Sequence, residues 1–200
     1  MDNYRTRRFI SIAVVVIIIG AALFGLIYLG NLLFFSNGNN ILTKTDTHQS
    51  DLLSTSASRA VRVDVRGPIV ADENFHSYQI QITPNNRALT IYNGYLSAVA
   101  DSESLGNNIP SYKQFVNALD QAKLMNSNEL TGTANNTDGV CATGFLYQFT
   151  ILNSNKQVKQ LWTTSCGNAS GSLGRNFNPL LSLFIVQIPD GLTKTSSIWQ

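Results

Sequence analysis

The chain has 200 residues, enough for one domain or two small ones. Only 13% of its residues are charged, and its net charge is +2. From Ala60 onward nine basic and nine acidic residues cancel. A region without a basic excess does not attract phosphates, so the composition excludes nucleic-acid binding as the main function.

The first element is an uncharged apolar stretch from Phe9 to Phe35. As a helix it would be about 40 Å long, more than the roughly 30 Å hydrocarbon core of a bilayer. A cleaved signal peptide would have a shorter apolar core and small residues before the cleavage site. A pilin-type N terminus would need a Gly before the stretch and a Glu at its fifth position, where this chain has Arg8 and Ala13. The pattern therefore predicts an uncleaved transmembrane helix over 9–35.

Basic residues set the expected orientation of this helix. Arg5, Arg7 and Arg8 precede it, and Lys44 is the only basic residue within fifteen positions after it. The positive-inside rule then places residues 1–8 in the cytoplasm and the rest of the chain outside. We expect a single-pass protein of the cell membrane whose partners are the membrane and a protein or other component of the cell envelope.

Three segments are expected after the span. Residues 36–59 are rich in Ser, Thr and Asn without a sustained period, which predicts a flexible linker. Residues 60–190 are long enough to bury a core and are expected to form the exported domain. Residues 191–200 are expected to be a C-terminal tail.

Alternating apolar residues predict three strands in the first half of this domain, carried by Val61, Val63 and Val65, by Tyr78, Ile80 and Ile82, and by Leu89, Ile91 and Tyr95. A four-residue loop over 84–87 would join the second and third strands as a hairpin. It would place Ile82 opposite Leu89 and Ile80 opposite Ile91. Both strands would then present their apolar side chains on one face of the sheet.

The second half is predicted to add two helices and another hairpin. A helix should begin at Asn108-Ile109-Pro110, because Pro is tolerated in a first helical turn. Another should begin with Asn178 as its N-cap, followed by Pro179, and stop at Pro189-Asp190-Gly191. Between them, alternation predicts one strand around Phe145, Tyr147, Phe149 and Ile151 and one around Val158, Gln160 and Trp162. The order β-β-β-α-β-β-α predicts an α+β domain, with an antiparallel sheet of about five strands covered by two helices.

The chain has two cysteines, Cys141 and Cys166, and both lie in the predicted exported domain. If residues 152–155 form the hairpin turn, Phe145 faces Trp162, and the two cysteines fall opposite one another at the open end. Cross-strand spacing and an oxidising exterior both suit a disulfide. A metal site would need further ligands nearby, and a redox centre more often has closely spaced cysteines. The pattern therefore favours a structural disulfide.

Catalytic motifs are weak in this sequence. His76 is the only histidine of the predicted domain, and the nearest candidate nucleophiles are Ser165, Ser170 and Ser172 in a Gly/Ser-rich loop. No Gly-x-Ser-x-Gly motif presents any of them. The same loop with Arg175 could hold an anion, but it lacks the Gly-Lys-Ser/Thr ending of a phosphate-binding loop. We expect a non-enzymatic binding or envelope-structural protein without cofactor or metal. A hydrolase using His76 and a serine of the loop is the alternative.

Two features carry a resemblance to known proteins. The segment Arg66-Gly67-Pro68-Ile69-Val70-Ala71-Asp72-Glu73-Asn74-Phe75 and the Cys141–Cys166 hairpin with its Gly/Ser loop resemble uncharacterised single-pass proteins of Saccharibacteria and related small-genome bacteria (Patescibacteria). The resemblance covers most of residues 60–190. It implies a membrane-anchored exported domain and does not imply an activity.

Overall fold

The structure is a computed structural model that describes residues 47–199 except 129, 168, 170, 175 and 176. The predicted transmembrane helix over 9–35, the cytoplasmic tail and residues 36–46 of the predicted linker lie outside the described residues. Within the described part, no helix is long and apolar enough to cross a membrane.

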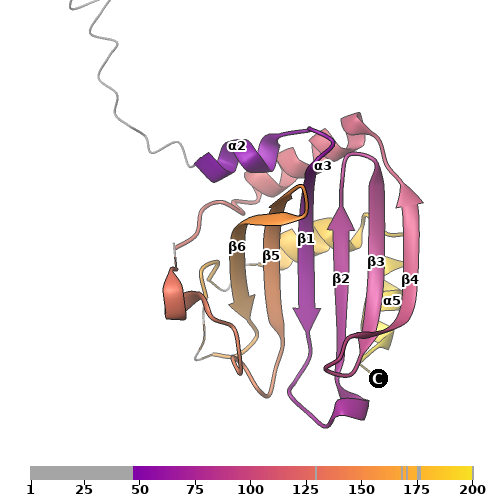
Figure 1. Cartoon of the computed structure of the whole chain (residues 1–200), viewed down its shortest axis with the longest axis vertical. Helices are drawn as coiled ribbons and strands as arrows, with labels where there is room; N and C mark the ends of the chain where they lie inside the picture. Colours follow the sequence, from indigo (N-terminus) through magenta and orange to yellow (C-terminus); the bar gives the residue numbers. More distant parts are fainter. Residues whose placement is uncertain (1–46, 129, 168, 170, 175–176, 200) are drawn as a thin grey trace, which may run out of the picture. The chain divides into compact units, whose positions relative to one another are not determined.

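The described residues form an α+β fold, as predicted. One antiparallel sheet of six strands has the spatial order β4-β3-β2-β1-β5-β6, and the helices lie on one of its faces (Figure 1). The strands are β1 (Arg59–Arg66), β2 (His76–Ile82), β3 (Asn86–Asn93), β4 (Ala98–Gly106), β5 (Leu146–Asn153) and β6 (Lys156–Thr164). The helices are α2 (Thr47–Leu53), α3 (Ile109–Gln121), α4 (Asn178–Ile185) and α5 (Gly191–Ser197), with short 3-10 turns η2 (Asp72–Asn74) and η3 (Gly132–Asn135).

The hydrophobic core lies between the sheet and these helices. The alternating apolar residues predicted for β1, β2, β3 and β5 belong to it or pack against it, except Tyr95, which lies beyond β3 and is 46% exposed. Helix α3 adds an apolar face of Tyr112, Phe115, Val116 and Leu119. At its centre the Phe184 ring of α4 lies 5.7 Å from Phe149 and 5.1 Å from Phe115, measured between ring centroids. Helix α3 begins as predicted, because the Asn108 side chain accepts a hydrogen bond of 2.9 Å from the Ser111 amide.

The hairpin β2–β3 is tighter than predicted, but its apolar face is the predicted one. Thr83 and Asn86 close a two-residue turn through a backbone hydrogen bond of 2.8 Å. Ile80 therefore pairs with Leu89, and Ile82 pairs with Arg87 rather than with Leu89. The pairing differs from the predicted one by two positions, and an even shift leaves each side chain on its own face.

The hairpin β5–β6 is also tighter than predicted, and here the prediction for Trp162 was wrong. Its turn consists of Ser154 and Asn155, whose φ angles of 50° and 63° are those of a type I′ turn. The tighter turn displaces the pairing by two positions, and a register shift between Ile151 and Leu152 adds a third. Phe149 consequently pairs with Leu161, and Trp162 pairs with Gln148 on the opposite face. Val158 still packs against the core, next to a register shift in the β5–β6 pairing.

The residues just before β1 are part of the fold, which corrects the part of the predicted flexible linker (36–59) that the structure describes, residues 47–59. Within α2, Leu52 is fully buried in the core. Gln49 donates a hydrogen bond of 2.9 Å to the Asp120 carboxylate of α3, and Arg59 forms an ion pair of 2.7 Å with Asp51. A chain that started at residue 60 would therefore lack α2, which covers part of the hydrophobic core. The compact unit starts at Asp46.

Two further elements were missed by the sequence analysis. Strand β4 is an edge strand whose side chains are mostly exposed, so it carries no apolar alternation. Helix α5 replaces the predicted tail over 191–200, and its Lys194 pairs with Glu103 of β4 at 2.6 Å. Helix α4 begins at Asn178, but its N-cap is Phe177, and it ends at Ile185 before the predicted stop.

Candidate functional site

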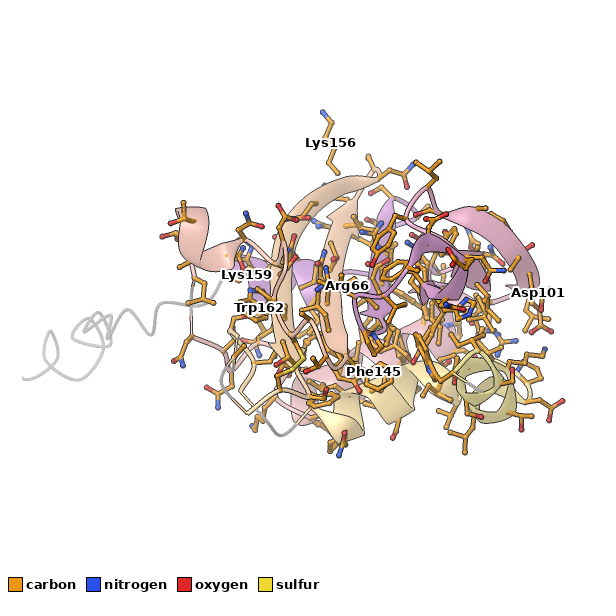
Figure 2. All side chains as sticks on the ribbon, turned by 90° about the horizontal axis from the view of Figure 1, so that it is seen from below. Arg66, Asp101, Phe145, Lys156, Lys159 and Trp162 are labelled. Atoms are coloured by element: carbon orange, nitrogen blue, oxygen red, sulfur yellow. A yellow bond between two sulfur atoms is a disulfide. The ribbon has the colours of Figure 1, made fainter. Side chains whose placement is uncertain are left out.

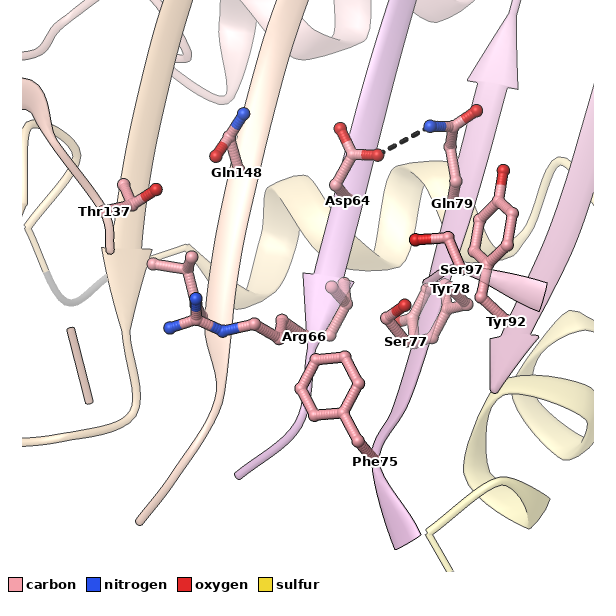
Figure 3. Close-up of a pocket in the computed structure, with 12 residues that line it drawn as sticks. Asp64, Arg66, Phe75, Ser77, Tyr78, Gln79, Tyr92, Ser97, Thr137 and Gln148 are labelled. Atoms are coloured by element: carbon pink, nitrogen blue, oxygen red, sulfur yellow. Dashed lines mark hydrogen bonds between the residues drawn. The ribbon is translucent and has the colours of Figure 1, made fainter. Parts of the chain in front are cut away.

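The face of the sheet opposite the four helices carries polar side chains at alternate positions. Part of this face is hollowed into a cavity of about 380 Å³, which we call the basin. Its polar lining consists of Asp64, Arg66, Ser77, Gln79, Tyr92, Ser97, Thr137 and Gln148, and its apolar lining includes Phe75 and Leu146 (Figure 3). The basin is thus a polar depression on strands β1, β2, β3 and β5, bordered by loops from distant parts of the chain.

The negative charge in the basin is already balanced by the protein. The Asp64 carboxylate accepts a hydrogen bond of 2.7 Å from Arg62 Nε, which is also an ion pair, and a second of 2.7 Å from Gln79 Nε2. All three residues lie on β1 and β2 and are partly exposed. Asp64 therefore has a cationic partner and a fixed orientation before any ligand arrives.

The positive charge in the basin is not balanced in this way. Arg66 donates one hydrogen bond, from Nη2 to the Val140 carbonyl at 2.7 Å, and its Nε is buried without a hydrogen-bond partner. Within the described part of the chain, no carboxylate forms an ion pair with it. Burial lowers the pKa of the Arg66 guanidinium from its ordinary value, and the Asp138 carboxylate opposes this effect at longer range. Because an arginine stays protonated in proteins, the guanidinium is a cation that lacks a close counter-ion.

The loop that holds Arg66 is fixed by the disulfide. Cys141 and Cys166 are bonded, with sulfurs 2.04 Å and Cα atoms 5.5 Å apart. They lie at the open end of the β5–β6 hairpin, as predicted, but not as an opposed pair within the strands. The ladder continues only to Phe145 and Ser165, and Cys141 has a φ of 55° in the turn beyond it. The sulfur bridge thereby places the Val140 carbonyl beside Arg66.

The opposite side of the basin is built by the segment around η2 and the β3–β4 turn. The Asp72 carboxylate accepts a hydrogen bond of 2.7 Å from the Tyr95 amide. The Tyr95 ring stacks on Phe75 at 4.0 Å, and its hydroxyl donates to the Val70 carbonyl at 2.7 Å. These contacts hold the Phe75 ring and Ser97 at the edge of the basin (Figure 3).

The residues that the sequence suggested for catalysis are used elsewhere. His76 Nδ1 lies 2.8 Å from Asn93 Oδ1, and the residue lines a second cavity of about 340 Å³ together with Phe145 and Trp199. Ser165 Oγ accepts a hydrogen bond from the Phe145 amide, and Ser172 Oγ accepts one from the Trp162 amide.

The remaining candidates, Ser170 and Arg175, lie outside the described residues. Among the described residues, His76 has no hydrogen bond to a serine of the 165–172 loop. In the same part of the chain, no group of three His, Cys, Asp or Glu residues could hold a metal ion.

The basin residues were present in the predicted strands but were not singled out. Arg62, Asp64 and Arg66 are the polar half of the alternation in β1, a pattern that a solvated sheet face produces as well. The signal that distinguishes a site is the contact of Arg66 with Val140, 74 positions later in the chain. Only the tertiary structure contains that contact.

No protein-family model matches the chain, and no curated protein sequence matches it at a significant level. Function must therefore be inferred from the residues and the geometry described above.

Proposed function

We propose that this protein is a membrane-anchored, extracytoplasmic binding protein whose ligand occupies the basin on the uncovered face of the sheet. The observation that carries the proposal is the unbalanced Arg66 cation in a polar cavity of about 380 Å³. That volume lies within the range of small-molecule sites, which is about 300–1,000 Å³. The sheet forms the floor of the site and the disulfide fixes the loop on one side of it, which favours a geometry that is set before binding.

The anchoring part of the proposal rests on the apolar stretch over 9–35 and the basic residues before it. A disulfide is consistent with an oxidising location outside the cytoplasm. The hydrolase alternative draws no support from the described residues, because His76 contacts Asn93 instead of a nucleophile. A binding function requires no such pair.

Two substitutions on one strand test whether the basin is the binding site. Ser77 and Gln81 both lie on the uncovered face of β2, but only Ser77 lines the basin. The full chain carrying Ser77→Trp should capture at least about tenfold less cell-envelope material than the parent chain, because the indole would occupy the space of the ligand in the cavity. The matched Gln81→Trp variant should keep that capture. Equal capture by both variants would show that the basin is not the site.

A protease experiment tests the orientation. Protease added to intact cells should degrade the folded domain and leave a membrane-embedded fragment of roughly the first 40 residues. Immunoblots against each end of the chain would follow the two parts. Full protection of the domain, in cells whose surface is shown to be accessible to the protease, would reverse the orientation.

A further inference from the structure

We infer that the ligand of the basin presents a carboxylate group, and that Arg66 is the residue that binds it. This inference rests on the proposed function and specifies the chemistry of the same site. It follows from the difference between the two charged groups that line the basin, Asp64 and Arg66.

The two charged groups of the basin differ in whether they already have a counter-ion, and this sets the sign of the charge that the basin can accept. Asp64 already has Arg62 as its counter-ion and Gln79 as a second donor. Arg66 carries five N–H donors, and its hydrogen bond in the described structure uses one of them, to an uncharged carbonyl. A partly buried cation without a counter-ion is destabilising, and an anionic group of a ligand offsets that cost. The basin is thus built for an anion.

The surroundings of Arg66 also indicate which kind of anion the basin binds. Phosphate sites commonly combine several cations with free backbone N–H groups, as at a helix N-terminus. The floor of this basin consists of strands whose backbone groups pair within the sheet. Arg66 is a single cation, and no carboxylate of the described residues forms an ion pair with it. One planar guanidinium matches one carboxylate in both charge and shape. The site therefore suits a singly charged carboxylate better than a phosphate.

The neutral polar lining of the basin indicates the chemistry of the rest of the ligand. Ser77, Gln79, Tyr92 and Gln148 surround the charged groups with neutral side chains that can both donate and accept hydrogen bonds. Such a lining suits a ligand body rich in hydroxyl or amide groups. An acidic sugar and the C-terminal end of a peptide both provide this combination, so the shared chemistry is a carboxylate on a polar body.

Nuclear magnetic resonance of the full chain in detergent micelles tests the inference with two matched pairs of probes. Glucuronate is compared with glucose, and acetyl-dialanine is compared with its amide. Because the Nε of Arg66 is buried, its N–H signal should be protected from exchange and observable. One acid or both should shift this signal and the amides around the basin, while the uncharged partner binds at least about tenfold more weakly. The pair that responds identifies the source of the carboxylate.

Variants separate a role of Arg66 in binding from a general effect of charge. Arg66→Gln should abolish binding of the acid, and Arg66→Lys should weaken it, because the charge remains without the planar fork. Arg87→Gln removes one positive charge from a residue that bonds to Gly106 and Gln187, away from the basin, and should leave binding unchanged. A similar loss in Arg66→Gln and Arg87→Gln would overturn the inference.

The failure of this inference differs from the failure of the proposed function. If the uncharged probes bind in the basin as well as the acids do, the basin is a binding site but the carboxylate is not required. If no probe shifts the basin while Ser77→Trp still abolishes capture of envelope components, the carboxylate inference fails and the proposed function stands. If no probe shifts the basin signals and Ser77→Trp leaves capture unchanged, both the carboxylate inference and the proposed function fail.

Discussion

Replacing Phe149 by alanine should lower the free energy of unfolding by about 3–5 kcal/mol, the range for truncating a buried aromatic side chain. Phe149 is 1% exposed, and its ring packs on Phe184, so the substitution leaves a cavity between β5 and α4. Urea unfolding of a chain that starts at Asp46, where the compact unit begins, would measure the change.

Gln81→Ala provides the control for this prediction. Gln81 is a partly exposed residue on the uncovered face of β2, and its truncation should change the free energy of unfolding by no more than about 0.5 kcal/mol. Small and equal changes for both variants would mean that the sheet and the helices do not enclose a single core.

Removing the disulfide should have the second large effect, and it should act on both stability and binding. The bond joins residues 25 positions apart, and a loop of that size corresponds to about 3 kcal/mol of stabilisation. The Cys141→Ser, Cys166→Ser double variant should lose this stability. Because the same loop holds Arg66 through Val140, the variant should also bind ligands of the basin more weakly.

The effect of the disulfide on ligand binding can be measured separately from its effect on stability. Binding should be measured well below the melting temperature of the double variant, where its circular dichroism matches that of the parent chain. Unchanged affinity there would mean that the bridge stabilises the fold without shaping the basin. Two alkylatable thiols in non-reduced, exported protein would contradict the disulfide itself.

Local patterns in the sequence predicted most of the strands and helices. The two hairpins show that such patterns did not predict the turn length or the strand register. Both turns were expected to have four residues, and both have two. The β2–β3 pairing was therefore displaced by two positions, and Ile80 kept its face. The β5–β6 pairing was displaced by two positions at its turn and by a third at the register shift between Ile151 and Leu152, so Trp162 changed face. Trp162 is still buried, because Asn135 and the segment at Gly171 cover it from the other side.

The missed elements lacked the signals on which prediction depends. Strand β4 is an edge strand with exposed side chains, and α2 and α5 are helices of seven residues each. Their stability comes from packing, such as that of Leu52, rather than from an amphipathic pattern. The basin was missed for a related reason. Its polar residues look like any solvated sheet face until Val140 and Thr137 are brought beside Arg66.

The bridge between Cys141 and Cys166 also decides what a cut in the exposed hairpin turn would do. Ser154, Asn155 and Lys156 are exposed, and Lys156 projects away from the body of the domain (Figure 2). All three lie inside the covalent ring that the bridge closes. A protease that cleaves after Lys156 would nick the chain without releasing either piece. The nicked protein would run as one band on a non-reducing gel, and two fragments would separate only after reduction.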